Sequence, residues 1–337
     1  MPNRCTIAAV AACAAALWTP CRGQNPPTTV LEIDMENVVN YVDDLADPSK
    51  VATASGISPS SISRIFKWAV AVGDIVAING RPVKGLYTYR FGPGMMATTI
   101  LTPGRNIADI TSGCPAEAQF AILHPDGAPI GSITASGFNS ATPPPGAPTT
   151  AINTTLAVVG GTGAFMGVRG QLSRAGDVGV RTASMLEDPA YRRVNKGGTR
   201  REIVQLVPMA RPEVAVTSAG PAVFHAEDFS PVTTAKPAQA GELLIMSVTN
   251  LGPTRPGVDP GKPFPKWEAG KEYIVNSPVE VTVGGQAAEV RNAIGWPEQT
   301  NVYRVDFRVP DGAKPGLANV GLTVAWIAGP EVKISLR

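Results

Sequence analysis

Residues 160–171 read Gly160-Gly-Thr-Gly-Ala-Phe-Met-Gly-Val-Arg-Gly-Gln171, directly after the apolar run Thr155-Leu-Ala-Val-Val159. Glycine reaches positive φ angles without a Cβ clash, so the pattern predicts a strand, a glycine-rich turn and a second strand. A phosphate-binding loop would need the N-terminus of a helix, and the residues after Gly170 are poor helix formers. The turn interpretation of Gly160, Gly161, Thr162 and Gly163 is therefore favoured over a nucleotide site.

The surrounding region, residues 60–208, consists of short alternating runs separated by turn signals. In Leu86-Tyr-Thr-Tyr-Arg-Phe91 the alternation places Tyr87 and Tyr89 on one face of a strand. The sequence His124-Pro-Asp-Gly127 predicts a turn, because proline presets φ, aspartate bonds nearby backbone and glycine accepts a left-handed conformation. Repeated short strands of this kind predict an all-β barrel or sandwich.

The glycine motif resembles that of the allene oxide cyclase and dirigent superfamily, in which plant cyclases carry Gly-Gly-Ser/Thr-Gly-x-Phe-x-Gly-Val-x-Gly-Gln. Residues 73–80 with Lys84-Gly85 are similar to the opening hairpin of those proteins, and residues 118–127 to a central hairpin of bacterial relatives. The resemblance implies an eight-stranded antiparallel barrel over residues 60–210 that binds hydrophobic small molecules. It also implies a homotrimer. Many dirigent proteins have an acidic residue at the position of Gly163, and its absence argues against their radical-coupling chemistry.

A second β domain is predicted for residues 218–337, after the Arg211-Pro212 junction. The expected strands are residues 222–225, 242–248, 279–283, 287–291, 303–309 and 319–326, with a hairpin turn at Gly284-Gly285. Their number and spacing fit an immunoglobulin-like β-sandwich without the cysteine pair. Residues 241–254, 278–288 and 302–312 resemble the C-terminal immunoglobulin-like domain of many secreted acidobacterial proteins, a domain to which no catalytic role is attached.

The N-terminal region has the layout of a secretory signal peptide, with Arg4, a short apolar core and small residues before Gly23. We expect cleavage after residue 23 and a secreted, periplasmic or extracellular protein. Lipoprotein anchoring at Cys13 is disfavoured, because almost no apolar core precedes it. Residues 24–59 are predicted to be a linker with a short amphipathic helix, since Val38, Val39, Val42 and Leu45 lie near helical spacing.

Charge and cysteine content exclude several classes of function. The chain has 29 basic and 27 acidic residues, and loss of Arg4 and Arg22 with the leader leaves 27 of each. This balance predicts no nucleic-acid partner, and no later segment is long and apolar enough for integral membrane association. Cys114 is the one cysteine after residue 23, so no internal disulfide is expected, and we predict that it is buried and inert.

Few residues carry catalytic chemistry. The two histidines are His124, expected as an exposed turn residue, and His225, on a predicted strand, so neither a metal site nor a cofactor site is expected. The run Arg192, Arg193, Lys196, Arg200 and Arg201, with acidic Glu187, Asp188 and Glu202 nearby, is interpreted as a solvated loop.

The remaining candidates belong to the barrel. Glu117 and Gln119 share one strand face, as do Tyr87 and Tyr89, and either pair lines the interior or faces water. A carboxylate in an apolar barrel would have a raised pKa, which makes Glu117 a candidate acid or base. Arg169 keeps the dirigent arginine position and is either a ligand contact or structural.

Three functions remain open. The barrel binds an apolar small molecule or a glycan without chemistry; or it is filled and the protein has a structural or surface-interaction role; or it is a cofactor-free cyclase, isomerase or dirigent-type protein using Glu117, a tyrosine or Arg169. We rank binding first, the structural role second and the enzyme third, so an enzymatic activity is disfavoured.

Overall fold

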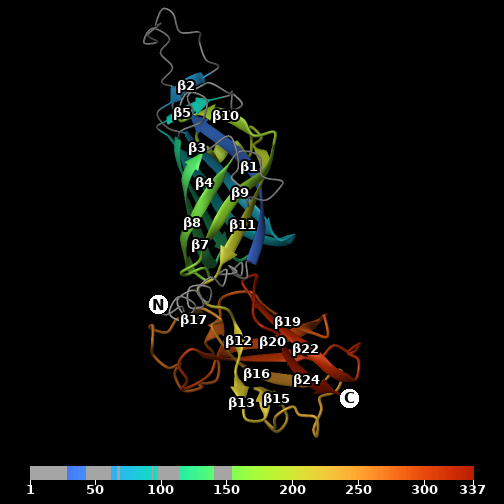
Figure 1. Cartoon of the computed structure of the whole chain (residues 1–337). Coiled ribbons are helices and arrows are strands. Elements are labelled where there is room, and N and C mark those ends of the chain that lie inside the picture. The colour runs from blue at the N-terminus through green and yellow to red at the C-terminus, as the bar shows by residue number, and fades with distance from the viewer. Residues whose placement is uncertain (1–28, 43–61, 67–68, 93, 98–113, 140–153) are drawn as a thin grey trace, which may run out of the picture.

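The computed structural model describes residues 29–42, 62–66, 69–92, 94–97, 114–139 and 154–337. These residues form an elongated β-barrel and a second, curled sheet that lies against one end of it (Figure 1). Apart from one turn of 3-10 helix at Pro189–Arg192, the regular structure of the described residues is all β, as predicted. None of the helical structure in these ranges has the length and apolar character needed to span a bilayer.

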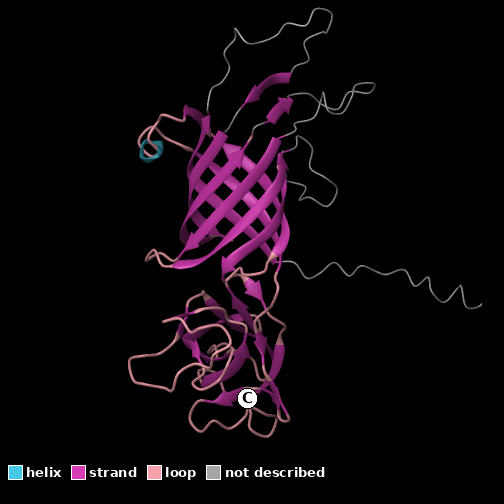
Figure 2. Cartoon of the chain, turned by 90° about the vertical axis from the view of Figure 1, so that its left-hand side faces the viewer, coloured by secondary structure: helices cyan, strands magenta, loops and turns pink. Residues whose placement is uncertain are grey.

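Eight antiparallel strands close the barrel within the described residues, and Figure 2 shows their tilt. Their order around the wall is β1-β11-β9-β8-β7-β6-β4-β3, and pairing of β3 with β1 completes the circle. The strands are β1 (Thr29–Val42), β3 (Ala69–Ile78), β4 (Arg81–Phe91), β6 (Cys114–Leu123), β7 (Pro129–Asn139), β8 (Thr155–Gly163), β9 (Arg169–Val178) and β11 (Gly198–Val207). Smaller elements are β10 (Arg181–Ser184), parallel to the end of β1, and the pair β2 (Ile62–Phe66) and β5 (Gly94–Ala97).

The helix predicted near residues 36–45 is wrong where the structure describes it, because residues 29–42 are strand β1. A β-bulge explains the mistaken period. The register of β1 shifts between Met35 and Val38, and Asn37 has a φ of 53°. The extra residue breaks the alternation of two, so the apolar positions mimic helical spacing. The barrel therefore starts before the predicted boundary at residue 60.

The glycine motif forms a strand, a turn and a second strand, as predicted, but Gly160, Gly161, Thr162 and Gly163 are the end of strand β8, and the turn lies at residues 164–167, before β9. Gly163 has a φ of 60°, and a Cβ there would lie 2.5 Å from the Ile130 carbonyl oxygen. A Cβ on Gly170 would lie 1.8 Å from the Gln205 carbonyl oxygen. These glycines are required by the close approach of neighbouring backbone, which places the motif in the fold rather than in a phosphate site.

The second β region contains all six predicted strands, in a curled, sandwich-like arrangement. Its longer strands are β16 (Leu243–Thr249), β19 (Val279–Val283), β20 (Gln286–Gly295), β21 (Val302–Arg308), β22 (Gly316–Val324) and β24 (Val332–Leu336). Shorter ones are β12 (Glu213–Val214), β13 (Val216–Thr217), β14 (Gly220–Pro221), β15 (Val223–His225), β17 (Thr254–Arg255), β18 (Ile274–Val275) and β23 (Ile327–Ala328). Gly284 and Gly285, both at positive φ, form the predicted hairpin turn between β19 and β20.

The two regions have separate cores that meet at one end of the barrel. Ala325 of the second region is buried with the barrel core, and the ring of Trp326 stacks on Phe165 of the glycine motif at 6.4 Å. We call this the proximal end of the barrel and the opposite end, where Ala69 and Cys114 are buried, the distal end.

Polar contacts add to this junction. The side-chain amide of Asn276 donates to the Pro129 carbonyl oxygen at 2.6 Å, and Nε2 of His124 contacts the carbonyl oxygen of Asn276. The turn at residues 124–127 is confirmed, with Gly127 at positive φ. His124 is a turn residue as expected, but it is half-buried rather than fully exposed, because its ring contacts Asn276 of the second region.

Candidate functional site

The inward side chains of the barrel change character along single strands. On β6, Ala116 and Ala118 lie toward the distal end, whereas Phe120 and Ile122 lie toward the proximal end. On β11, Arg200 and Glu202 precede Val204 and Leu206 in the same direction. The proximal half is thus filled by large apolar side chains, and the distal half combines small residues with tyrosine and charge.

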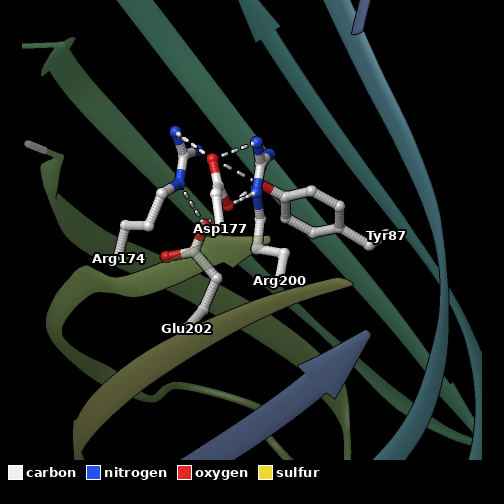
Figure 3. A network of polar contacts seen from close by, with 5 residues as sticks. All are labelled: Tyr87, Arg174, Asp177, Arg200 and Glu202. Carbon is white, nitrogen blue, oxygen red and sulfur yellow. Dashed lines mark hydrogen bonds and ion pairs between the residues drawn. The ribbon is translucent and has the colours of Figure 1, made fainter. Parts of the chain in front are cut away.

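Five side chains of the distal half form one polar cluster, the interior cluster (Figure 3). They are Tyr87 of β4, Arg174 and Asp177 of β9, and Arg200 and Glu202 of β11. Tyr87 and Glu202 are fully buried and both arginines nearly so, whereas the Asp177 side chain is 28% exposed. Asp177 therefore connects a buried charged group with solvent.

A second bulge places these charges opposite one another. Arg200 pairs with Asp177 and Glu202 pairs with Arg174 in the β9–β11 ladder, so β9 has one residue more than β11 between the two pairs. The extra residue keeps both members of each pair on the inner face of the wall. Local backbone geometry thus builds two adjacent ion pairs inside the barrel.

Oε1 of Glu202 is the centre of the cluster. It accepts from the Tyr87 hydroxyl at 3.1 Å and from Nε of Arg174 at 3.1 Å. Arg200 donates from Nη1 to the Tyr87 oxygen at 3.1 Å and forms a bidentate pair with Asp177 at 2.6 and 2.9 Å. Two cations therefore face two carboxylates, and the tyrosine links both pairs.

Burial controls the protonation of the tyrosines. Desolvation, with a smaller contribution from the Glu202 charge, raises the pKa of Tyr87 well above its usual value. Desolvation also raises the pKa of Tyr89 to about 12, although the nearby charge of Arg174 opposes the shift. Both phenols therefore remain protonated at neutral pH, and that of Tyr87 donates to Glu202.

The second carboxylate oxygen of Glu202, Oε2, is buried and has no hydrogen-bond partner within the described residues. Leaving such an acceptor unsatisfied costs about 1–3 kcal/mol, and more when the group is charged. An oriented acceptor of this kind is suited to receive a hydrogen bond from a ligand hydroxyl or amine, or to take up a proton from it.

The structure divides the predicted site residues into two groups. Tyr87 belongs to the interior cluster, and the Arg174 guanidinium lies 5.0 Å from the centre of the Tyr89 ring. Glu117 and Gln119 lie on the outer face of β6, where Gln119 and Arg90 both donate to the Glu117 carboxylate. Arg169 lies at the proximal end, is exposed, and donates to the Val168 carbonyl oxygen at 2.9 Å. Among the described residues, Glu202 rather than Glu117 is the predicted kind of buried carboxylate inside the barrel.

The interior cluster was missed because its arginine and glutamate were assigned to a solvated loop. That interpretation is wrong for residues 198–207, which are strand β11. Alternation was the available signal, since Arg200 and Glu202 are in phase with Val204 and Leu206. Arg192 is also buried, and its guanidinium pairs with Asp74 at 2.5 Å.

The histidines and the cysteine lie away from this cluster. His225 is buried on β15, its Nδ1 contacts a Glu242 carboxylate oxygen, and its Nε2 lies 3.2 Å from the Lys236 carbonyl oxygen. Cys114 is buried as predicted, and burial raises the pKa of its thiol. Among the described residues no group of three or more His, Cys, Asp or Glu side chains is arranged to hold a metal ion.

Comparison with known proteins adds no family assignment to this geometry: neither a family model nor a curated protein matches the chain.

Proposed function

We propose that the protein is a secreted binding protein whose barrel holds a small, largely apolar molecule at its distal end. In this proposal Ala71, Ala116 and Ala118 lie against the apolar part of the ligand, and the interior cluster fixes its polar group. The resemblance to allene oxide cyclase-like and dirigent-like barrels supports a hydrophobic ligand. The resemblance of the second region to secreted immunoglobulin-like domains supports an extracellular role.

The observation that carries the proposal is the unpaired Oε2 of Glu202. A buried network normally satisfies its own acceptors, because an unsatisfied one is costly in a low-dielectric interior. Here Oε1 receives two donors and Oε2 none within the described residues. A ligand hydroxyl or amine that donates to Oε2 would remove that cost and select ligands with a donor at one end.

Native mass spectrometry of the full chain, with displacement of the apolar dye N-phenyl-1-naphthylamine, tests the proposal. We expect a co-purifying molecule or saturable dye binding. Glu202→Gln should lower the affinity for the natural ligand about tenfold or more, because the amide has one acceptor oxygen and one donor group in place of two acceptor oxygens. Glu117→Gln, on the outer face of the barrel, is the matched control and should bind as the parent does. A barrel that carries nothing and binds no dye would refute the proposal.

A structural role is the second candidate, and the packing of the proximal half favours it. Large side chains such as Ile122, Phe165 and Leu206 fill that half, and Trp326 covers its end. If the distal half is filled as well, the barrel is a rigid support for the second region. Failure of the binding experiment together with a loss of stability in Glu202→Gln would favour this role, because the charge would then serve the fold rather than a ligand.

A further inference from the structure

The second region has an open groove on the sheet face that points away from its core. Tyr303, Val305 and Phe307 of β21 face the core, so the alternate residues of that strand face outward. The groove has a volume of about 600 Å³. It is lined by residues of two strands, Asn292 and Ile294 of β20 and Arg304 of β21, and by three aromatic rings, Phe229, Trp267 and Trp296.

Two exposed aromatic rings lie together in this groove. The side chain of Trp267 is 63% exposed and that of Phe229 is 51% exposed. Phe229 also has a φ of 55°, a left-handed conformation that bulky residues rarely adopt. Exposed aromatic surface and a strained backbone are both unfavourable for folding, and together they indicate a binding surface.

Polar groups of fixed geometry lie among these rings. The Arg304 guanidinium lies 5.6 Å from the centre of the Phe229 ring, and the buried carboxylate of Asp306 holds it at 2.7 and 2.9 Å. Glu272, Asn292 and Glu298 add acceptors and a donor. Acidic residues of the groove outnumber its one arginine, which disfavours a polyanionic ligand.

We propose that this groove binds a neutral oligosaccharide. A pyranose ring presents apolar C–H faces, which pack on aromatic rings, and hydroxyl groups at its edge, which need both donors and acceptors. Trp267, Trp296 and Phe229 supply the faces, while Arg304, Asn292 and the two glutamates supply the hydrogen bonds. The proposal is independent of the barrel and gives the second region a carbohydrate-recognition role.

Affinity electrophoresis of the full chain through gels containing hydroxyethylcellulose, xylan or laminarin tests this site. We expect retardation by at least one of these neutral polysaccharides and about a tenfold or greater loss of affinity in Trp267→Ala, because an aromatic anchor is removed. Trp267→Phe should retain part of the binding. Tyr191→Ala, which removes a ring of similar exposure from the barrel region, is the matched control.

Three results would overturn the proposal. The first is the absence of retardation by all three polysaccharides, and the second is equal retardation of Trp267→Ala and the parent protein. The third is a dimer in sedimentation that Trp267→Ala dissociates, which would make the groove an interface between copies of the chain. Glu202→Gln leaves this binding unchanged, so failure here is separable from failure of the barrel proposal.

Discussion

On β11 the inward side chains of the distal half are Arg200 and Glu202, and those of the proximal half are Val204 and Leu206. One strand with one alternation thus supplies a charged interior at one end and an apolar interior at the other. The apolar end is stabilised by burial, which is non-directional and tolerates changes of similar volume. The charged end depends on each partner being present, because a lone buried charge is costly.

The comparison shows that packing alone does not explain the side chains inside the distal half of the barrel. Replacing a buried ion pair by apolar residues of similar volume is often neutral or stabilising, so stability alone gives no reason for two arginines and a glutamate inside. The proximal half shows that this sequence is able to fill a barrel with aliphatic side chains. The charges of the distal half are therefore the feature that the proposed binding function has to explain.

The largest expected effect comes from breaking the buried pair. Glu202→Ala removes the nearer carboxylate partner of the buried Arg174, leaving only the 3.9 Å contact with Asp177, and should lower the free energy of unfolding by about 3–5 kcal/mol. Urea denaturation, extrapolated to water at unchanged slope, measures it. A loss under about 1 kcal/mol would mean that solvent reaches the cluster and that the two halves do not differ as described.

Two further variants make this comparison quantitative. Leu206→Ala, on the same strand in the proximal half, should cost about 2–5 kcal/mol through a cavity alone. The double change Arg174→Met with Glu202→Leu should recover most of the loss of Glu202→Ala, since no uncompensated charge remains. By contrast, a second substitution in a neighbouring apolar side chain should restore the stability of Leu206→Ala only if it refills the cavity.

A smaller effect is expected from filling the distal half. Ala118 faces inward opposite Tyr89, and Ala118→Leu adds three carbon atoms there. If a ligand occupies this region, the variant should lose N-phenyl-1-naphthylamine binding while its free energy of unfolding changes by less than about 1 kcal/mol. Destabilisation by about 1–3 kcal/mol would instead show a packed interior, because overpacking forces strained rotamers. Dye titration and urea denaturation of the same sample decide between the two.

The local features of the fold were predictable from sequence, and the site was not. The turn between β8 and β9 and the turn at Gly284-Gly285 follow from glycines that accept positive φ, here Gly163, Gly167, Gly284 and Gly285, and the strands follow from their alternation. Strand β1 was missed because the bulge near Asn37 interrupts its alternation. Bulges are set by pairing with distant strands, which the local sequence does not show.

The interior cluster illustrates the same limit. Tyr87 was a candidate because its strand alternates clearly, but Arg200 and Glu202 are charged residues at positions where the pattern demands apolar ones. Their burial depends on Arg174 and Asp177 lying opposite, some 25 positions earlier in the chain. Conversely, Glu117 was an attractive candidate by residue type, yet the phase of Ala116 and Ala118 places it outside.

An effect smaller than that of Glu202→Ala is expected for charges that lie outside the wall. Asp74 lies on the outer side of β3, where Arg192 and Arg193 hold its carboxylate at 2.5 and 2.7 Å. Burial alone would raise the pKa of Asp74, but hydrogen bonds from Arg192, Arg193 and Asn37 outweigh it and hold the pKa below its usual value. A depressed carboxyl pKa contributes stability that is fully present above the unfolded-state pKa, about 4, and is lost as the pH falls through the folded-state pKa.

Asp74→Asn should therefore lower the free energy of unfolding at pH 7 by about 1–2 kcal/mol. Below about pH 4, the free energy of unfolding of the variant should fall less steeply with falling pH than that of the parent. Urea denaturation at pH 7 and at several values below pH 4 measures both effects. Asp34→Asn is the matched control, because Asp34 pairs with the half-exposed Arg201 and should change stability at pH 7 by less than about 1 kcal/mol. If Asp74→Asn cost as much as Glu202→Ala, burial inside the barrel would not be what makes the interior charges critical. The distinction between the charged and the apolar half would then have to rest on ion-pair geometry instead.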